Sequence, residues 1–267
     1  MLKDGQQVRV WNRTAAKAAA LQQDGAIVCN TPAEAVSGAE YIHLTLKDDE
    51  TVDDVLAQAK QGMHLGATII DHTTTSVEGA IKRTQQWKEA GYTYLHAPVF
   101  MGPVNALEAT GYMLIAGDQS VIATVSPRLE KMTGKLMNLG PVEGKAASLK
   151  LIGNLFLITL TAGISETMAL SKALGISGSE LSSLFDLWNP GSMMPARLKR
   201  MMAGSYDNPS WELNMARKDA GLMLEEAKMA EVALQMLPAI VANMDQFIER
   251  GMGQKDWTVI GSDNLLQ

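Results

Sequence analysis

The sequence predicts an α/β fold in which a doubly wound, mainly parallel sheet over residues 1–145 precedes an all-α domain over residues 146–267 with a long central helix. Two observations predict this arrangement. In the first half, short apolar runs alternate with amphipathic segments, which is typical of parallel strands covered by helices on both faces. After Lys145 the pattern changes to an apolar, proline-free segment of about 25–30 residues, which we expect to form a buried helix. Every later segment has helical periodicity.

Seven short apolar runs have the length and composition of strands. In chain order they are Val8–Trp11, Ala26–Val28, Tyr41–Leu46, Thr68–Asp71, Thr93–His96, Met113–Ala116 and Leu136–Leu139. Amphipathic segments between them fit helices, namely Thr14–Gln23, Glu50–Gln61, Ser76–Glu89 and Gln119–Met132. Before the first strand, the residues MLKDGQQ fit the last turn of a helix that Gly5 closes.

Composition narrows the class of protein. The chain has 267 residues, of which 46% are hydrophobic, enough for two domains with substantial cores. Its net charge of −6 argues against nucleic acid as a partner. The single cysteine, Cys29, cannot form an internal disulfide, which fits a reducing, cytoplasmic compartment. The polar start predicts no secretory signal, and the longest apolar stretch, Leu151–Ile164, is shorter than the ~20 residues of a membrane span. None of the four histidines has the spacing of a zinc site, so we expect no metal.

The corner after the first strand carries Asn12, Arg13 and Thr14, with Lys17 one turn further. In a dinucleotide-binding sheet, an acid at this corner bonds the 2′-hydroxyl of NAD, whereas a cation accommodates the 2′-phosphate of NADP. Arg13 therefore favours NADP over NAD, although an arginine after any strand can also be a solvated loop charge. The glycine loop G-x-G-x-x-G that should precede such a corner is absent from the residues before Val8.

Several segments together resemble the β-hydroxyacid dehydrogenase family, which includes 3-hydroxyisobutyrate dehydrogenase and relatives of 6-phosphogluconate dehydrogenase. They are VRVWNRTAAKAAAL, IIDHTTTS, HAPVFMGPVNALEATG, GKAASLKLIGN and WELNMARKDAGLMLEEAK. The resemblance covers essentially the whole chain and implies a Rossmann-type sheet with a bound nicotinamide cofactor. It also implies that the family's first strand and glycine loop, about 20–25 residues, are missing from the start, so we expect a truncated sheet.

The resemblance also assigns cofactor-binding positions. The family's D-x-S-T-x-S turn places Thr74 against the nicotinamide ribose. The loop LTLKDDE places Leu46 and Lys47 beside the cofactor, and the family's K-D pair places Lys218 near its nicotinamide end. Read without the resemblance, the threonine-rich turn is a helix cap and Lys218 is a solvated charge.

The catalytic prediction rests on Lys150 and Asn154, which match the family's G-x-x-x-K-x-x-N-N segment. Residues four apart lie on one face of a helix, so both side chains can hold one small oxygenated substrate. Burial lowers the pKa of an ammonium group, which would let Lys150 act as general acid in carbonyl reduction and as base in the reverse direction. The alternative is a lysine that extends to the surface.

Two departures from the family pattern affect the substrate site. Gly153 precedes Asn154 where the family has a second asparagine, and Phe100 and Met101 replace the Ser-Gly of the loop that binds a substrate carboxylate in relatives. Gly102 retains the loop's next glycine. Phe100 has no hydroxyl group, so we expect a larger apolar pocket with fewer anion donors. An aldehyde, ketone or imine then becomes a plausible substrate beside a hydroxyacid.

Two functions remain open from the sequence. The first is an NADP-dependent oxidoreductase for a small-molecule substrate, which the resemblance implies to be a homodimer or larger homo-oligomer through its helical domain. The second is a helical assembly or regulatory module that has lost cofactor binding with the glycine loop. Binding of NADPH separates the two.

Overall fold

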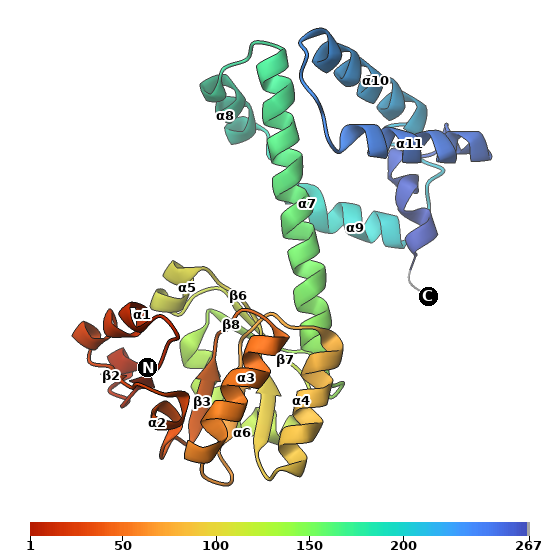
Figure 1. The fold of residues 1–267 in the computed structure, drawn as a ribbon. Helices are drawn as coiled ribbons and strands as arrows, with labels where there is room; N and C mark the ends of the chain where they lie inside the picture. The colour runs from red at the N-terminus through yellow and green to blue at the C-terminus, as the bar shows by residue number, and fades with distance from the viewer. Residues whose placement is uncertain (266–267) are drawn as a thin grey trace. The chain divides into compact units, whose positions relative to one another are not determined.

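The computed structural model describes residues 1–265 and divides the chain into two compact units. The first unit spans Met1–Leu155, and the second begins at Phe156. The boundary lies within the long helix α7 (Lys145–Ala173). Figure 1 shows a first unit of strands and helices and a second unit of helices only. The predicted order of an α/β half before an all-α half is confirmed.

The first unit contains three small sheets. Neighbouring strands are parallel except for β6 and β7, which are antiparallel. The sheets are β1 (Arg9–Val10) with β2 (Ile27–Val28), then β3 (Tyr41–Leu44), β4 (Thr68–Asp71) and β5 (Thr93–His96), and finally β6 (Val99–Phe100), β7 (Tyr112–Ile115) and β8 (Lys135–Asn138). The predicted mainly parallel pairing is confirmed. The short strand β6 was not predicted.

Helices of the first unit begin at caps that the sequence encodes locally. Asp48 accepts a hydrogen bond from the Thr51 amide at the start of α3, and Ser76 accepts one from the Gly79 amide at the start of α4. A 3₁₀ turn ends at Gly5, whose φ of 74° requires a glycine-like backbone, as predicted. The helices are α1 (Ala15–Ala19), α2 (Pro32–Val36), α3 (Asp49–Ala59), α4 (Val77–Glu89), α5 (Pro103–Glu108) and α6 (Gln119–Leu129). The two short helices α2 and α5, each with a proline in the first turn, were not predicted.

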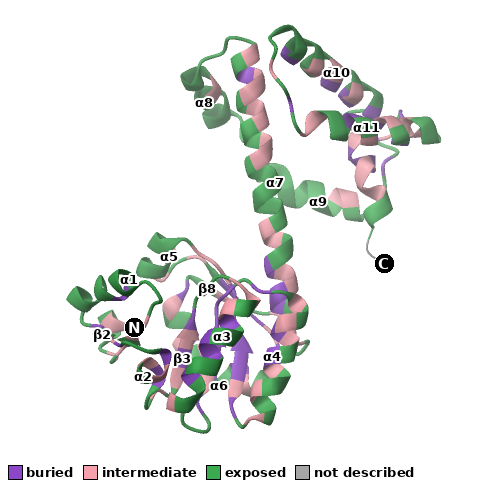
Figure 2. Cartoon of the chain, in the orientation of Figure 1, coloured by how far each residue is buried: buried purple, intermediate pink, exposed green. Residues whose placement is uncertain are grey.

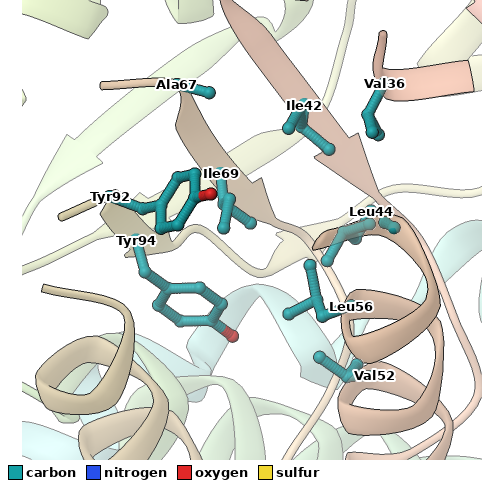
Figure 3. Packing of buried hydrophobic residues seen from close by; sticks show 10 residues of the cluster. Val36, Ile42, Leu44, Val52, Leu56, Ala67, Ile69, Tyr92 and Tyr94 are labelled. Carbon is teal, nitrogen blue, oxygen red and sulfur yellow. The ribbon is translucent and has the colours of Figure 1, made fainter. Parts of the chain in front are cut away.

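Two apolar clusters form the core of the first unit. Figure 3 shows one of them, in which Ile42, Leu44 and Ile69 of the sheet pack against Val52 and Leu56 of α3. The other cluster packs β4, β5 and β7 against α6 through Ile70, Leu95, Met113, Ile115, Ile122, Val125 and Leu129.

The second unit is helical throughout its regular structure. After α7 it contains α8 (Gly178–Leu187), α9 (Met194–Met202), α10 (Leu213–Met229) and α11 (Leu237–Phe247), with short helical turns between and after them. Leu213, Ala216 and Ala220 of α10 pack against Val241 and Met244 of α11 to form its core.

Helix α7 has the predicted length but not the predicted burial. It runs for 29 residues, and Figure 2 colours most of it exposed or intermediate. Ile152, Ile158 and Ile164 are 60%, 66% and 53% exposed. The expectation of a buried helix is wrong for the single chain, because one chain offers too little surface to cover a helix that is apolar on every side. Among the described residues, α7 alone is long and apolar enough to cross a membrane, a test that long core helices also pass.

Candidate active site

We call the sheet of β3, β4 and β5 the central sheet. Three chain segments leave this sheet at the same edge. Strands β3, β4 and β5 are parallel and in register, so Leu44, Asp71 and His96 lie side by side at their carboxyl ends. In open α/β sheets, ligands bind outside these ends. The loop after β3, the turn after β4 and the segment after β5 therefore form the candidate site. They contain six of the predicted positions, namely Leu46, Lys47, Thr74, Phe100, Met101 and Gly102.

The turn after β4 is held from beneath by a buried carboxylate. Asp71, which is fully buried, accepts hydrogen bonds from the Thr73 amide at 2.9 Å and from the Tyr94 hydroxyl at 2.6 Å. Thr73 and Thr75 are buried, whereas Thr74 between them is exposed. The turn thus presents the hydroxyl-bearing side chain of Thr74 outward, at the place predicted to meet the cofactor ribose.

The loop after β3 is bonded directly to that turn. The Leu46 amide donates a hydrogen bond of 3.0 Å to the Thr73 hydroxyl. Lys47 is exposed and forms an ion pair of 3.0 Å with Asp48, the cap of α3. The structure therefore brings Leu46 and Lys47 beside the Thr74 turn, and their role at the cofactor stays a prediction.

A buried ion network, which was not predicted, connects the same two segments from the helix side. Arg83 on α4 is 2% exposed; its Nε donates to the Tyr94 hydroxyl at 3.1 Å and its Nη2 to the Asp49 carboxylate at 2.5 Å. Asp49 also accepts from the Ser76 amide at 2.8 Å. We call Arg83, Tyr94, Asp71 and Asp49 the Arg83 network. Burial and the Asp71 carboxylate raise the pKa of Tyr94, so its phenol stays protonated and donates to Asp71.

Two histidines connect the turn after β4 with neighbouring segments through hydrogen bonds. His72 Nδ1 lies 2.8 Å from the Ala97 carbonyl oxygen, and His96 Nε2 lies 2.8 Å from that of Thr73. Because a carbonyl only accepts, His72 carries its proton on Nδ1, and its Nε2 accepts from His43 at 3.0 Å. Burial, reinforced by His72, lowers the pKa of His43 to about 3, so the pair is neutral. The described residues contain no cluster of three or more acidic, histidine or cysteine side chains that could hold a metal.

The predicted catalytic lysine lies under an aromatic ring. Lys150 on α7 is 8% exposed, and its Nζ lies 4.2 Å from the centroid of the Phe100 ring. Burial lowers the pKa of this ammonium group. Asn154 lies one turn further along the same helix and is partly exposed. Lys150 and Phe100, predicted separately for catalysis and substrate binding, are thus in contact.

The residues after Phe100 offer few free donors. Met101 is partly buried and packs against the core cluster of α6. The Gly102 amide donates to the Asn105 side chain at 2.9 Å, so this amide is already used. The predicted shortage of anion donors in this loop is consistent with these contacts.

The remaining predicted positions belong to other elements. Asn12, Arg13 and Thr14 are exposed after β1, and Asn12 accepts a hydrogen bond from the Thr14 amide at 2.9 Å. Strand β1 pairs with β2 and not with the central sheet. Lys218 belongs to α10 in the second unit, where it forms an ion pair of 2.8 Å with its neighbour Asp219. Its predicted role at the cofactor stays a prediction.

Comparison with known proteins agrees with this architecture. The family model described as the NAD binding domain of 6-phosphogluconate dehydrogenase matches residues 1–140. The model described as the NAD-binding domain of NADP-dependent 3-hydroxyisobutyrate dehydrogenase matches residues 144–261. Glyoxylate/succinic semialdehyde reductase 1 of Arabidopsis thaliana is 27% identical over 266 residues, covering 97% of this chain and 91% of that protein.

Solved structures show the same fold. An imine reductase from Myxococcus stipitatus in complex with NADP+ superposes with a TM-score of 0.90 at 19% identity, covering 97% of this chain and 92% of its own. A V8 variant of that enzyme in complex with NAD+ gives a TM-score of 0.87 at 18% identity, with 97% and 91% covered. From the two family matches, which together account for nearly the whole chain, we conclude that the protein belongs to the β-hydroxyacid dehydrogenase family of NAD(P)-dependent oxidoreductases.

Proposed function

We propose that the protein is an NADP-dependent reductase or dehydrogenase acting on a small hydroxyacid, aldehyde, ketone or imine. The observation that carries the proposal is the placement of Lys150, which is buried on α7 with its ammonium group against an aromatic ring. A buried lysine whose pKa is lowered by desolvation releases its proton more readily than an exposed lysine, which suits it to proton transfer. A lysine with only a structural role would extend its amine to water.

In this proposal Lys150 moves the proton and Asn154 orients the substrate. In the reducing direction the Lys150 ammonium donates a proton to the carbonyl oxygen or imine nitrogen, and in the oxidising direction the neutral amine accepts it. The Asn154 amide, one helical turn away, can donate a hydrogen bond to the same oxygen or nitrogen. The face of the Phe100 ring stabilises the charged form of Lys150, which partly offsets the cost of burying it.

The residues at the sheet edge fit a nicotinamide dinucleotide. Thr74 is exposed between two buried threonines and would hold the nicotinamide ribose, with Leu46 and Lys47 beside it. Arg13 and Lys17 are both exposed and would accommodate a 2′-phosphate, which favours NADP over NAD. A bound cofactor would supply or accept the hydride.

Two measurements test this function. The first is binding of NADPH, followed by its fluorescence; the second is substrate-dependent loss of NADPH with small aldehydes and cyclic imines. We expect Lys150→Met to retain NADPH binding and to lose about 10²–10⁴-fold in kcat, which is the range of a general acid. Absence of NADPH binding would contradict the proposal and favour the cofactor-free helical module.

We also propose that the chain forms a homodimer, or a larger homo-oligomer, through α7. Large side chains on this helix are exposed in the single chain, among them Ile152, Ile158, Ile164 and Met168. Contiguous apolar surface of this kind marks an interface. Light scattering after gel filtration should give at least twice the mass of one chain, and Ile158→Glu should shift it toward the monomer. A monomer that binds lipid vesicles would overturn both this assignment and the proposed cytoplasmic location.

A further inference from the structure

We propose that Phe100 and Gly153 act as one specificity-determining pair, which keeps a carboxylate away from Lys150 and selects a substrate with an apolar group at that position. This inference rests on the proposed function and names its substrate class: an uncharged aldehyde, ketone or imine in preference to a hydroxyacid or its oxo form. Both residues depart from the pattern of the family, and in the structure they meet.

The two positions exclude each other sterically. A Cβ atom added at Gly153 would lie 2.4 Å from Cζ and 2.8 Å from Cε1 of Phe100, which is closer than carbon atoms approach. Neither backbone can move freely, because Gly153 lies inside α7 and Phe100 pairs with Tyr112 in the β6–β7 ladder. With the ring in this position only glycine fits at 153, so a side chain at 153 requires the ring to turn away or a smaller residue at 100.

The pair also removes the groups that would bind an anion. Phe100 carries no hydroxyl, Gly153 carries no side-chain amide, and the Gly102 amide is bonded to Asn105 at 2.9 Å. The ring covers one side of the Lys150 ammonium at 4.2 Å. Apart from the Lys150 ammonium, which the ring covers on one side, a carboxylate placed there would find few donors in exchange for its lost water. An alkyl or aromatic group would instead pack on the ring.

Two aldehydes of matched shape test the selectivity. Succinic semialdehyde carries a carboxylate where 4-methylpentanal carries an isopropyl group, so the ratio of their kcat/KM values isolates the charge. We expect the wild type to favour 4-methylpentanal. The double variant Phe100→Ser/Gly153→Asn, which restores a hydroxyl and an amide, should move the ratio toward succinic semialdehyde by about 10- to 100-fold, as expected for one or two hydrogen bonds to a charged group.

The steric part is tested without catalysis, by melting temperature. Alanine is favoured over glycine inside a helix. Gly153→Ala should nevertheless lower the melting temperature in the wild type and raise it in a Phe100→Ser background, where the ring is gone. Gly163→Ala on the same helix is the matched control, because a Cβ there has no neighbour within 4 Å; it should raise the melting temperature in both backgrounds. Equal effects of Gly153→Ala in the two backgrounds would overturn the pairing.

Titration calorimetry with succinate, which cannot be reduced, separates this inference from the proposed function. We expect succinate to bind the Phe100→Ser/Gly153→Asn protein and not the wild type. If the wild type reduces neither aldehyde, the succinate titration still decides the selectivity while the proposed hydride transfer fails. If both aldehydes are reduced and neither their ratio nor succinate binding responds to the double variant, the selectivity role is wrong and the oxidoreductase function stands.

Discussion

The Arg83 network makes Tyr94 the most informative single position in the first unit. Its hydroxyl donates to Asp71 at 2.6 Å and accepts from Arg83 at 3.1 Å, so one oxygen atom joins a buried carboxylate to a buried guanidinium. Figure 3 shows the ring of Tyr94 near that of Tyr92, beside the apolar cluster of the sheet. The change Tyr94→Phe removes this oxygen and leaves the apolar packing of the ring in place.

The expected cost follows from burial. Asp71 is 0% exposed and the Arg83 side chain 2%, so water cannot replace the lost hydroxyl. A hydrogen bond to a charged group contributes about 1.5–3 kcal/mol, and two such bonds are lost, so we expect a destabilisation of about 3–6 kcal/mol. For a domain of this size that lowers the melting temperature by about 10 °C. Because Asp71 orients the Thr73 amide, NADPH should also bind several-fold more weakly.

Differential scanning calorimetry and NADPH fluorescence titration measure the two effects. Tyr92→Phe is the matched control. Tyr92 lies in the same apolar cluster, is 9% exposed and packs edge-on against Trp87. Its hydroxyl has no hydrogen-bond partner among residues 1–265. Its removal should change the melting temperature by no more than about 2 °C. If Tyr94→Phe is as stable as Tyr92→Phe, the network does not stabilise the unit. If it is unstable but binds NADPH normally, the network does not position the turn.

Three further predictions test other parts of the molecule. Arg13→Glu should shift the ratio of NADPH to NADH affinity toward NADH by at least about tenfold, and an unchanged ratio would place the 2′-phosphate elsewhere. The rate of reduction should fall as the pH rises through the pKa of Lys150. Burial lowers this pKa, so the fall should come at a pH below the ordinary 10.5. Lys150→Met should abolish this fall in the pH–rate profile. In the second unit, the buried carboxylate of Asp256 accepts hydrogen bonds from Ser210 and Thr258. Burial alone would raise the pKa of Asp256, but these hydrogen bonds outweigh it and lower the pKa from 3.8 to about 2. Its contribution to stability is therefore present above about pH 4 and lost as pH falls toward 2, and acid unfolding of Asp256→Asn should lack this component.

Local sequence signals determined most of the regular structure. Strands β4 and β5 and helix α4 begin or end within a residue of their predicted bounds, because apolar periodicity and a capping side chain act over only a few residues. The same locality placed Lys150 and Asn154 on one face of α7, and it placed Thr74 in a turn at the end of a strand. The family resemblance added the chemical roles, which periodicity cannot supply.

Tertiary structure alone decided what these residues touch. No local pattern around Arg83 predicts its burial, yet packing brings it to Asp49, 34 residues away. Tyr94 likewise meets Asp71 across 23 residues. The contact of Phe100 with Gly153 depends on how β6 and α7 pack, and no local pattern encodes it. The exposure of α7 could not be predicted either. The hydrophobicity of the helix shows that its surface must be covered, but only the folded chain shows how much of that surface the chain covers by itself.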